Sequence, residues 1–452
     1  MISEGESQII TSDIKKTSHR TSSGIEALLL VLFATSCFGY FATASFHEFW
    51  TLIIIQTFQY VIYFLMAYFL IREGHLSLRA IVTVGILARM IIMFSTPVLE
   101  DDYWRYLWDA RVGAHGINPY LFSPLDSALD FLKTDYRSWI GWSQFSTIYP
   151  PFAQVVLTIS HFIAPDSLMG LKIIFVSFDV ATGFLLIKWL KKKNENMAWS
   201  FLYWLSPLVL KEISNSAHMD SIAIFFSMLA IYLFPIKRYK DHWAYICLAL
   251  ATGIKLYPLV LLPLFLRLDS KWKSNFLIYF GVLLSGYLFY SDAGLKLFVG
   301  TTAYGKFWLF NASLFHGFSY IINFIVGSEL LHLNANDILT KILVGIIFLA
   351  GLTWQTKNLK LRSDLSSASL FTLGFLLILS PVVDAWYVLW LFPLAVLRKN
   401  VPWLSFSYLV LASYSWFFSK DMALFFRAAE YLIFFGILLY YWQFKWKSKI
   451  SL

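Results

Sequence analysis

Long apolar runs separated by short polar loops recur from residue 25 to residue 444 of the sequence. A run of about 20 apolar residues spans a bilayer as an α-helix that satisfies its own backbone hydrogen bonds. The pattern therefore predicts an all-α, polytopic transmembrane bundle of about 11 to 14 helices. Helices are expected at 25–45, 50–71, 80–98, 170–190, 197–212, 218–235, 275–290, 338–356, 367–382, 384–398, 401–418 and 422–444.

Three apolar segments do not fit a simple alternation of crossings. Segments 149–164 and 314–328 are short, and we expect them to be re-entrant or tilted half-helices. Segment 243–266 contains Gly253 and Pro258, which interrupt a regular helix. We expect this segment to be one broken helix or a pair of helices.

Basic clusters in the loops predict the orientation, because cytoplasmic loops of membrane proteins are enriched in Lys and Arg. We expect both termini in the cytoplasm, with a polar tail at 1–24, a transmembrane domain at 25–444 and a basic tail at 445–452. The remaining loops then face outward, and the longest of them is Val98 to Ile148, called the acidic loop below. The basic clusters are Lys15–Arg20, Arg72–Arg79, Lys188–Lys193, Lys237–Lys240, Arg267–Lys273, Lys357–Arg362, Arg398–Lys399 and Lys445–Lys449.

The composition excludes several classes of protein. Hydrophobic residues make up 58% and charged residues 14% of the chain, whereas about one quarter of a soluble domain is charged. The net charge is +9. The basic residues lie in short inter-helix loops, so the topology of a membrane protein explains this charge better than binding of a nucleic acid does. Cys37 and Cys247 lie in apolar segments and predict small core residues rather than a disulfide framework.

Nucleotide-binding and metalloprotease motifs are absent from the sequence, which lacks GxGxxG, GxxxxGK[ST] and HExxH patterns. No cytoplasmic loop is long enough to bind a nucleotide sugar or ATP. An enzyme with this sequence would therefore take its activated substrate from the bilayer.

Three adjacent carboxylates, Glu100, Asp101 and Asp102, follow an apolar helix directly and open the acidic loop. Their mutual repulsion should raise at least one pKa, which suits a general base or a cation site. At helical spacing Asp102, Arg105 and Asp109 share one face. The alternative is a solvated helix end without a chemical role.

Further ionisable residues occur at apolar segments on the expected outer side. His218 and Asp220 lie at a helix start, where they are functional candidates or the capped end of a helix. Lys255 lies inside an apolar run and needs an anionic partner or a route to the interface. A lipid phosphate is one such partner. Weaker candidates on the same side are Tyr149, Asn311, Trp386, Tyr387 and Arg427.

These motifs occur in an order that resembles membrane glycosyltransferases of the GT-C type, over roughly residues 80 to 400. The nearest branch is that of bacterial mannosyltransferase-like proteins, which use polyprenyl-phosphate sugars. The first pair of motifs, EDDYWRYLWD and GINPY, is the most specific. The matching segments are 100–109, 116–120, 148–152, 217–220, 255–258, 308–313 and 380–387.

The resemblance implies that Asp102 is the catalytic base, assisted by Asp101 and Glu100. One departure is Ala217, where a glycine is expected before the histidine, and it weakens the role given to His218. Residues expected to bind the donor and its phosphate are Lys255, Arg105, Arg427 and Tyr257. Residues expected to bind substrate are His218, Asp220, Asn118, Tyr120, Tyr149, Asn311, Trp386 and Tyr387.

The expected reaction transfers a hexose, with mannose implied by the resemblance, from a polyprenyl-phosphate-linked donor to an extracytoplasmic glycan or lipid acceptor. The resemblance also implies that the protein lies in the cell membrane, which would be the inner membrane of a bacterium. No cofactor and no metal are predicted, although clustered carboxylates such as Asp101 and Asp102 could hold a divalent cation. The alternatives are a multi-pass transporter or flippase for lipid-linked sugars, and a polysaccharide polymerase or ligase.

Overall fold

The structure is a computed structural model that describes residues 24–43, 48–235, 241–326 and 335–450. These residues fold into helices, and the only β contact among them is an isolated bridge between Phe310 and Val382. The all-α fold class is therefore confirmed. Residues 1–23 of the expected tail at 1–24, the basic cluster Lys237–Lys240 and most of the outer loop 329–337 lie outside the described residues.

The described chain contains six helices long and apolar enough to cross a membrane, or seven if α12 and η8–α13, bent by 104°, form one span. The six are 24–42, α2, α6, 337–358 within α15, 362–379 (η9 and α16) and 420–444 within α19. The α-helices are α2 (Phe49–Glu73), α3 (Leu78–Met93), α4 (Asp102–Ala114), α5 (Pro151–Ile163), α6 (Leu168–Lys192), α7 (Phe201–Trp204), α8 (Pro207–Val209), α9 (Asp220–Leu233), α10 (Asp241–Ile254), α11 (Leu262–Leu268), α12 (Trp272–Phe289), α13 (Val299–Phe307), α14 (Leu314–Val326), α15 (Ala335–Asn358), α16 (Leu365–Leu379), α17 (Phe392–Arg398), α18 (Val401–Leu409) and α19 (Lys420–Ile450).

Shorter helical turns connect and extend these helices. The 3₁₀ segments are η1 (Cys37–Ala42), η2 (Ser127–Leu132), η3 (Asp135–Trp139), η4 (Met197–Ser200), η7 (Tyr257–Leu261), η8 (Ser291–Phe298), η9 (Arg362–Asp364), η10 (Ala385–Trp390) and η11 (Val410–Phe417), and η5 (Leu210–Asn215) is a π-helix.

Several segments expected as single helices are broken in the structure. The segment 197–212 divides into η4, α7, α8 and part of η5, because Ser206 caps a new helix that begins at Pro207. The segment 384–398 likewise divides into η10 and α17, with Pro393 in the first turn of α17. In 401–418, α18 tightens into η11.

The expected interruptions elsewhere are confirmed. Helix α10 ends at Ile254 and Pro258 opens η7, so segment 243–266 is a broken helix. A side chain at Gly253 would place its Cβ only 2.1 Å from Phe152 on α5, so glycine permits close contact between the two helices. Helices α5 and α14 have 13 residues each, or about 20 Å, and are too short to cross a bilayer alone.

Buried polar contacts fix the helices around the core. Arg89 on α3 forms a buried ion pair with Asp179 on α6 and donates to the backbone oxygen of Trp204 at 2.8 Å. Tyr203 donates to the other oxygen of Asp179 at 2.6 Å. Cys37 and Cys247 are free and buried, as expected.

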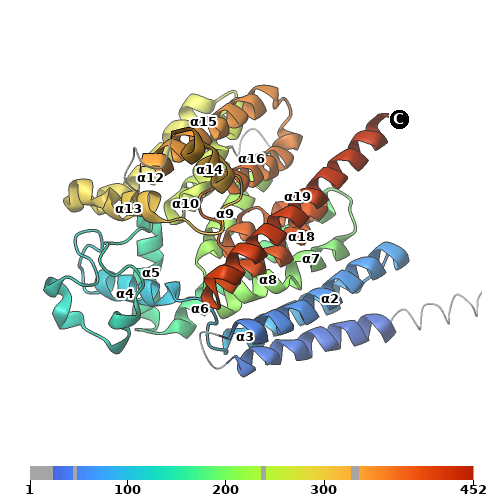
Figure 1. Cartoon of the computed structure of the whole chain (residues 1–452), viewed down its shortest axis with the longest axis horizontal. Coiled ribbons are helices and arrows are strands. Elements are labelled where there is room, and N and C mark those ends of the chain that lie inside the picture. The colour runs from blue at the N-terminus through green and yellow to red at the C-terminus, as the bar shows by residue number, and fades with distance from the viewer. Residues whose placement is uncertain (1–23, 44–47, 236–240, 327–334, 451–452) are drawn as a thin grey trace, which may run out of the picture.

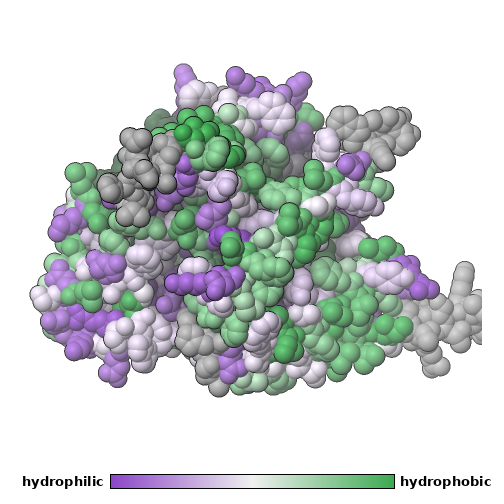
Figure 2. All heavy atoms as spheres, in the orientation of Figure 1, coloured by the Kyte–Doolittle hydropathy of each residue, from purple (hydrophilic) through white to green (hydrophobic). Residues whose placement is uncertain are grey.

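The acidic loop folds into α4, η2 and η3 and forms a lobe at one end of the molecule (Figure 1). The first described helix and α19 reach toward the opposite end. Large apolar side chains are exposed along the spanning helices, including Ile54 (68%), Ile346 (59%) and Leu432 (74%), and Figure 2 shows apolar patches beside a more hydrophilic lobe. Exposed apolar area of this extent indicates contact with lipid.

Candidate active site

The loop that follows α3 is fixed in place before it reaches the three carboxylates. Lys172 of α6 donates to the backbone oxygens of Met93 and Ser95, at 3.1 and 2.8 Å, at the carboxyl end of α3. The side chain of Asn215 accepts from the Val98 N–H at 3.0 Å. Leu99, directly before Glu100, has a φ of 56°, a left-handed conformation that costs about 1 kcal/mol or more in a non-glycine residue. A fixed, strained turn therefore presents the acidic residues.

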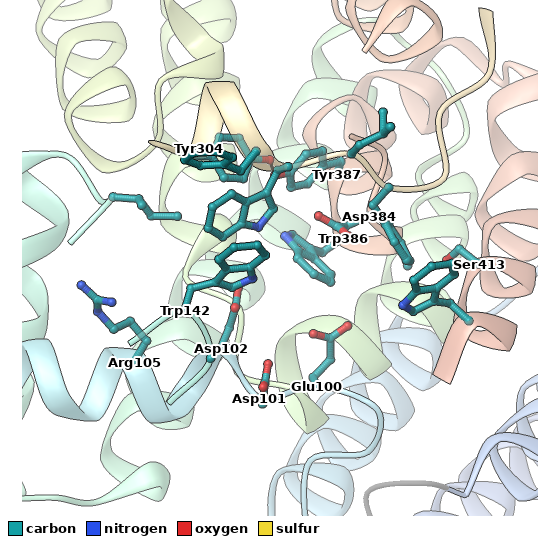
Figure 3. Close-up of a pocket in the computed structure, with 18 of the residues that line it drawn as sticks. Glu100, Asp101, Asp102, Arg105, Trp142, Tyr304, Asp384, Trp386, Tyr387 and Ser413 are labelled. Atoms are coloured by element: carbon teal, nitrogen blue, oxygen red, sulfur yellow. Dashed lines mark hydrogen bonds between the residues drawn. The ribbon is translucent and has the colours of Figure 1, made fainter. Parts of the chain in front are cut away.

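These residues open onto a cavity of ≈ 460 Å³, called the main cavity below. Figure 3 shows the three carboxylates on one side of it and Asp384, Trp386 and Tyr387 across from them. Its wall also contains aromatic residues from α13, η11 and the acidic loop. These aromatic residues include Trp142, Phe145, Tyr304, Phe307, Trp308, Tyr414, Trp416 and Phe417.

Asp101 and Asp102 lie at the start of α4 and face the main cavity. Neither carboxylate forms an ion pair or accepts a hydrogen bond from another described residue, so both are free to meet a substrate. Asp101 is exposed to the cavity, but protein surrounds it on most sides. This desolvation, with the charge of Asp102, raises the pKa of Asp101 from 3.8 to about 6. The sequence predicted a raised pKa from mutual repulsion of the carboxylates; the pKa of Asp101 is shifted in that direction, but burial is the larger cause.

Glu100 points to a buried charged cluster behind the cavity wall. The Tyr414 hydroxyl lies 2.7 Å from a carboxylate oxygen of Glu100 and 2.7 Å from one of Glu212, and its single proton is donated to one of the two. The Lys211 ammonium lies 3.3 Å from Glu212 and 3.7 Å from Glu100, and His218 Nε2 lies 3.4 and 3.7 Å from the same two residues. Burial raises the pKa of Glu100 well above its usual range, although Lys211 opposes the shift.

Lys255 lies in the main cavity wall and is already paired. Its ammonium lies 3.1 Å from Asp220 Oδ2, and the indole of Trp390 donates to Asp220 Oδ1 at 2.7 Å. Tyr257 stacks on Trp390 with ring centroids 4.3 Å apart. Asp220 therefore connects Lys255 to an aromatic stack, and Tyr257 supports that stack from outside the cavity.

Two chain segments distant in sequence form the opposite wall. The Phe310 N–H donates to the Pro381 oxygen at 3.1 Å, and the Val383 N–H donates to the Phe310 oxygen at 2.9 Å. This short bridge holds Asp384 against the cavity. Trp386 next to it stacks on His218 with centroids 4.1 Å apart, so the buried cluster also positions an aromatic wall.

A comparison with known families decides the class of the protein. The model for glycosyltransferase family 87 matches residues 147–381. The chain belongs to glycosyltransferase family 87. This family is of the GT-C type, so the resemblance seen in the sequence is confirmed at that level, and the protein is a membrane glycosyltransferase. A search of curated proteins and a search of solved structures found no match.

The other candidate residues of this glycosyltransferase lie at different distances from the main cavity. Arg105 and Tyr149 line it, but Arg105 is paired with Asp109 at 2.9 Å. Tyr120 lies behind the wall and donates to the backbone oxygen of Tyr149 at 2.7 Å. Asn118 bonds to Asp292 at 2.6 Å. Substrate-binding roles for Asn118 and Tyr120 stay predictions, and the structure shows both as supports of the lobe.

Asn311 and Arg427 lie in a second cavity of ≈ 280 Å³. Arg427 contacts His316 Nε2 at 2.9 Å, and the Asn311 amide donates to Glu430 at 3.1 Å. The donor-binding set expected from the sequence is thus divided between two neighbouring cavities.

Several residues that line the main cavity or lie directly behind its wall were not expected from the sequence. Lys211 and Glu212 are adjacent charges inside an apolar stretch, a signal that marks functional residues in membrane proteins. Tyr414, Trp142 and Tyr304 carry no such signal, because aromatic residues are frequent throughout this chain. Only the fold brings them to the acidic loop.

One group of described residues has spacing suitable for a metal ion. The ligand atoms of Glu100, Glu212 and His218 lie within 4.8 Å of one another. Lys211 already supplies a positive charge to both carboxylates of this group. The expectation that the glycosyltransferase uses no metal stays a prediction, and the group that could hold a cation extends inward from Glu100 rather than to Asp101 and Asp102.

Proposed function

We propose that the protein transfers a hexose, with mannose as the first candidate, from a polyprenyl-phosphate-linked donor to a hydroxyl group of an extracytoplasmic glycan or lipid. The observation that carries this proposal is the position of Asp101 and Asp102. Both carboxylates, free of ion pairs, face an aromatic-lined cavity at the lobe of a membrane glycosyltransferase. A base at this position can meet a hydroxyl while the donor stays anchored in the bilayer.

In the proposed reaction, the acceptor oxygen forms a bond to the anomeric carbon of the donor sugar. The bond between that carbon and the phosphate oxygen breaks, and polyprenyl phosphate leaves with the electron pair. Asp102 takes the hydroxyl proton. A positioned general base typically contributes about 10²- to 10⁴-fold to the rate. The negative charge of Asp101 beside it favours the transfer of this proton to Asp102.

The walls of the main cavity suit a sugar. Its volume of ≈ 460 Å³ lies within the usual range for small-molecule sites, about 300 to 1,000 Å³. Trp142 and Trp308 lie with ring centroids 4.0 Å apart, and Trp386 and Tyr387 lie opposite the carboxylates. Aromatic faces offer apolar contact to the C–H faces of a sugar ring, while the carboxylates accept hydrogen bonds from its hydroxyl groups.

The arrangement of the chain supports a lipid-linked donor and the expected topology. The sequence has no nucleotide-binding motif, and the described ends of the chain lie away from the acidic lobe (Figure 1). We therefore propose a cell-membrane protein with both termini in the cytoplasm and the main cavity facing outward. The acceptor would be reached from the outer side.

The acceptor and the sugar can be identified by mass spectrometry of cell-envelope glycans and glycolipids with and without the gene. We expect one species to lose a single hexose on deletion. The wild-type gene should restore it, and a gene encoding Asp102→Asn should not. An unchanged glycan and glycolipid profile, or full restoration by the variant, would reject the proposed function.

A further inference from the structure

The second cavity adjoins the main cavity. Leu309, Phe310, Ser413 and Trp416 line both of them. A ligand larger than a sugar could therefore occupy the two cavities together, or two ligands could lie side by side across this shared wall.

The two cavities differ in charge. The main cavity is lined by two carboxylates free of ion pairs, Asp101 and Asp102, by the acidic residues Glu100 and Asp384, and by two cations, Arg105 and Lys255. Both cations are already paired, Arg105 with Asp109 and Lys255 with Asp220. The main cavity is therefore a poor site for the negative charge of a phosphate.

The second cavity is lined by Arg427 and Lys420 and by no carboxylate. Arg427 contacts the ring of His316, and the Lys420 ammonium lies 5.4 Å from the ring centroid of Trp416. Within the described part of the chain neither cation has a carboxylate as an ion-pair partner. Glu430, one turn along α19, is buried and held by Asn311 instead. Glu430 is close enough to interact electrostatically with Arg427 but forms no ion pair with it. Two cations without an ion-pair partner indicate a site for an anion.

The surroundings of the second cavity indicate that the anion is carried by a lipid. Leu424 and Phe425 on α19 are 61% and 71% exposed, and Tyr320 and Phe324 on α14 are 75% and 83% exposed. Arg427 belongs to a helix of membrane-spanning length, where an unpaired charge is costly and marks function. An acyl or prenyl chain could lie along these apolar side chains while its phosphate reaches Arg427.

We propose that the second cavity binds the phosphate group of a membrane lipid through Arg427 and Lys420. The inference rests on the proposed function, because it assumes that a lipid substrate is delivered to the main cavity. A lipid phosphate here has two sources, the polyprenyl phosphate of the donor or the headgroup of a phospholipid acceptor. In either case the charge of the lipid lies beside the acidic cavity and its sugar or hydroxyl group reaches across Phe310 and Trp416.

Binding without turnover tests this proposal. Native mass spectrometry of the purified full chain in detergent would measure the dissociation constants of sugar-free polyprenyl phosphate and of phosphatidylglycerol. We expect Arg427→Gln and Lys420→Gln to weaken binding of one of these lipids by about ten- to a hundredfold, the usual effect of losing a hydrogen bond to a charged group. Arg427→Lys should retain most of the affinity. Lys296→Gln removes an exposed cation outside the cavity and should change nothing.

The lipid whose binding is weakened identifies the source of the phosphate. Weaker binding of polyprenyl phosphate assigns the cavity to the donor, and weaker binding of phosphatidylglycerol assigns it to a phospholipid acceptor. If Arg427→Gln lowers the melting temperature, the lipid binding of Lys420→Gln decides, because Lys420 is exposed. The proposal would be overturned if the glutamine variants bound both lipids as tightly as the parent does. It would also be overturned if the parent bound neither lipid. Since no sugar transfer is measured, this outcome is independent of whether the proposed function holds.

Discussion

The raised pKa of Asp101 predicts how transfer depends on pH. Asp101 lies beside Asp102, and the negative charge of an ionised Asp101 favours transfer of the hydroxyl proton to Asp102. With a pKa of about 6, Asp101 is ionised in roughly nine molecules out of ten at pH 7 and in about one out of ten at pH 5. A neutral Asp101 no longer favours this proton transfer. The transfer rate should therefore fall about tenfold between pH 7 and pH 5.

Replacing each residue in turn separates the base from its neighbour. Asp101→Asn is neutral at every pH, so its rate should be about tenfold lower than the parent's at pH 7 and should change little between pH 7 and pH 5. Asp102→Asn removes the proton-accepting oxygen and should lower the rate by about 10²- to 10⁴-fold at every pH. The assay is the initial rate of hexose transfer by purified protein between pH 4.5 and pH 8.

Thermal unfolding of the two variants provides the control. Because burial raises the pKa of Asp101, the stability linked to its protonated form is present below pH 4 and lost as the pH rises through about 6. Asp101→Asn should therefore melt at or above the parent's temperature at pH 7.5. The reasoning would be refuted if Asp101→Asn were inactive and Asp102→Asn active, or if the acidic limb of the parent lay near pH 4.

Three further predictions concern topology and packing. Ser127→Cys, on an exposed position of the acidic loop, should react with a membrane-impermeant maleimide in intact cells, and labelling only after permeabilisation would reject the orientation. Lys255→Met leaves the buried Asp220 unpaired and should lower the free energy of unfolding by about 3 to 5 kcal/mol. Adding Asp220→Asn to this variant should restore much of that stability. Equal melting temperatures of the single and double variants would contradict the ion pair. Gly253→Ala places a Cβ 2.1 Å from an aromatic ring on α5 and should cost about 1 to 3 kcal/mol, while Gly281→Ala, with open space around it, should be neutral or stabilising by thermal unfolding.

The sequence was most informative where a local signal was strong. The acidic run at Glu100 to Asp102 was predicted as the chemical centre, and its side chains do line the main cavity. The lysine at 255 was predicted to need an anionic partner, and the structure supplies Asp220. Gly253 and Pro258 interrupt a helix as their backbone properties require.

The sequence was least informative where function depends on contacts between distant segments. Glu100 comes close to Glu212 only because α3 packs against η5 and Tyr414 of η11 contacts both carboxylates. Helix breaks were also missed where an apolar run continued through them, as at Ser206 and Pro207, because hydropathy does not distinguish one long helix from several short ones.

Arg427 illustrates a third kind of limit. Its type and its place in an apolar helix predicted a phosphate contact, but the sequence could not show that it lies in a different cavity from Lys255. Only the spatial arrangement separates an acidic cavity with paired cations from a neighbouring cavity with unpaired cations. That separation changes which residue is expected to hold a lipid phosphate.

The most direct test of the central claim is turnover of polyprenyl-phosphate hexoses, with mannose first, by purified protein in nanodiscs. A lipid and glycan extract of the source cells would supply the acceptor, and the measurement is release of polyprenyl phosphate together with appearance of labelled sugar in the acceptor. We predict coupled release and transfer by the parent, and about 10²- to 10⁴-fold less of both by Asp102→Asn. Absence of release from every polyprenyl-phosphate hexose tested, or turnover by Asp102→Asn within a few fold of the parent, would contradict the account.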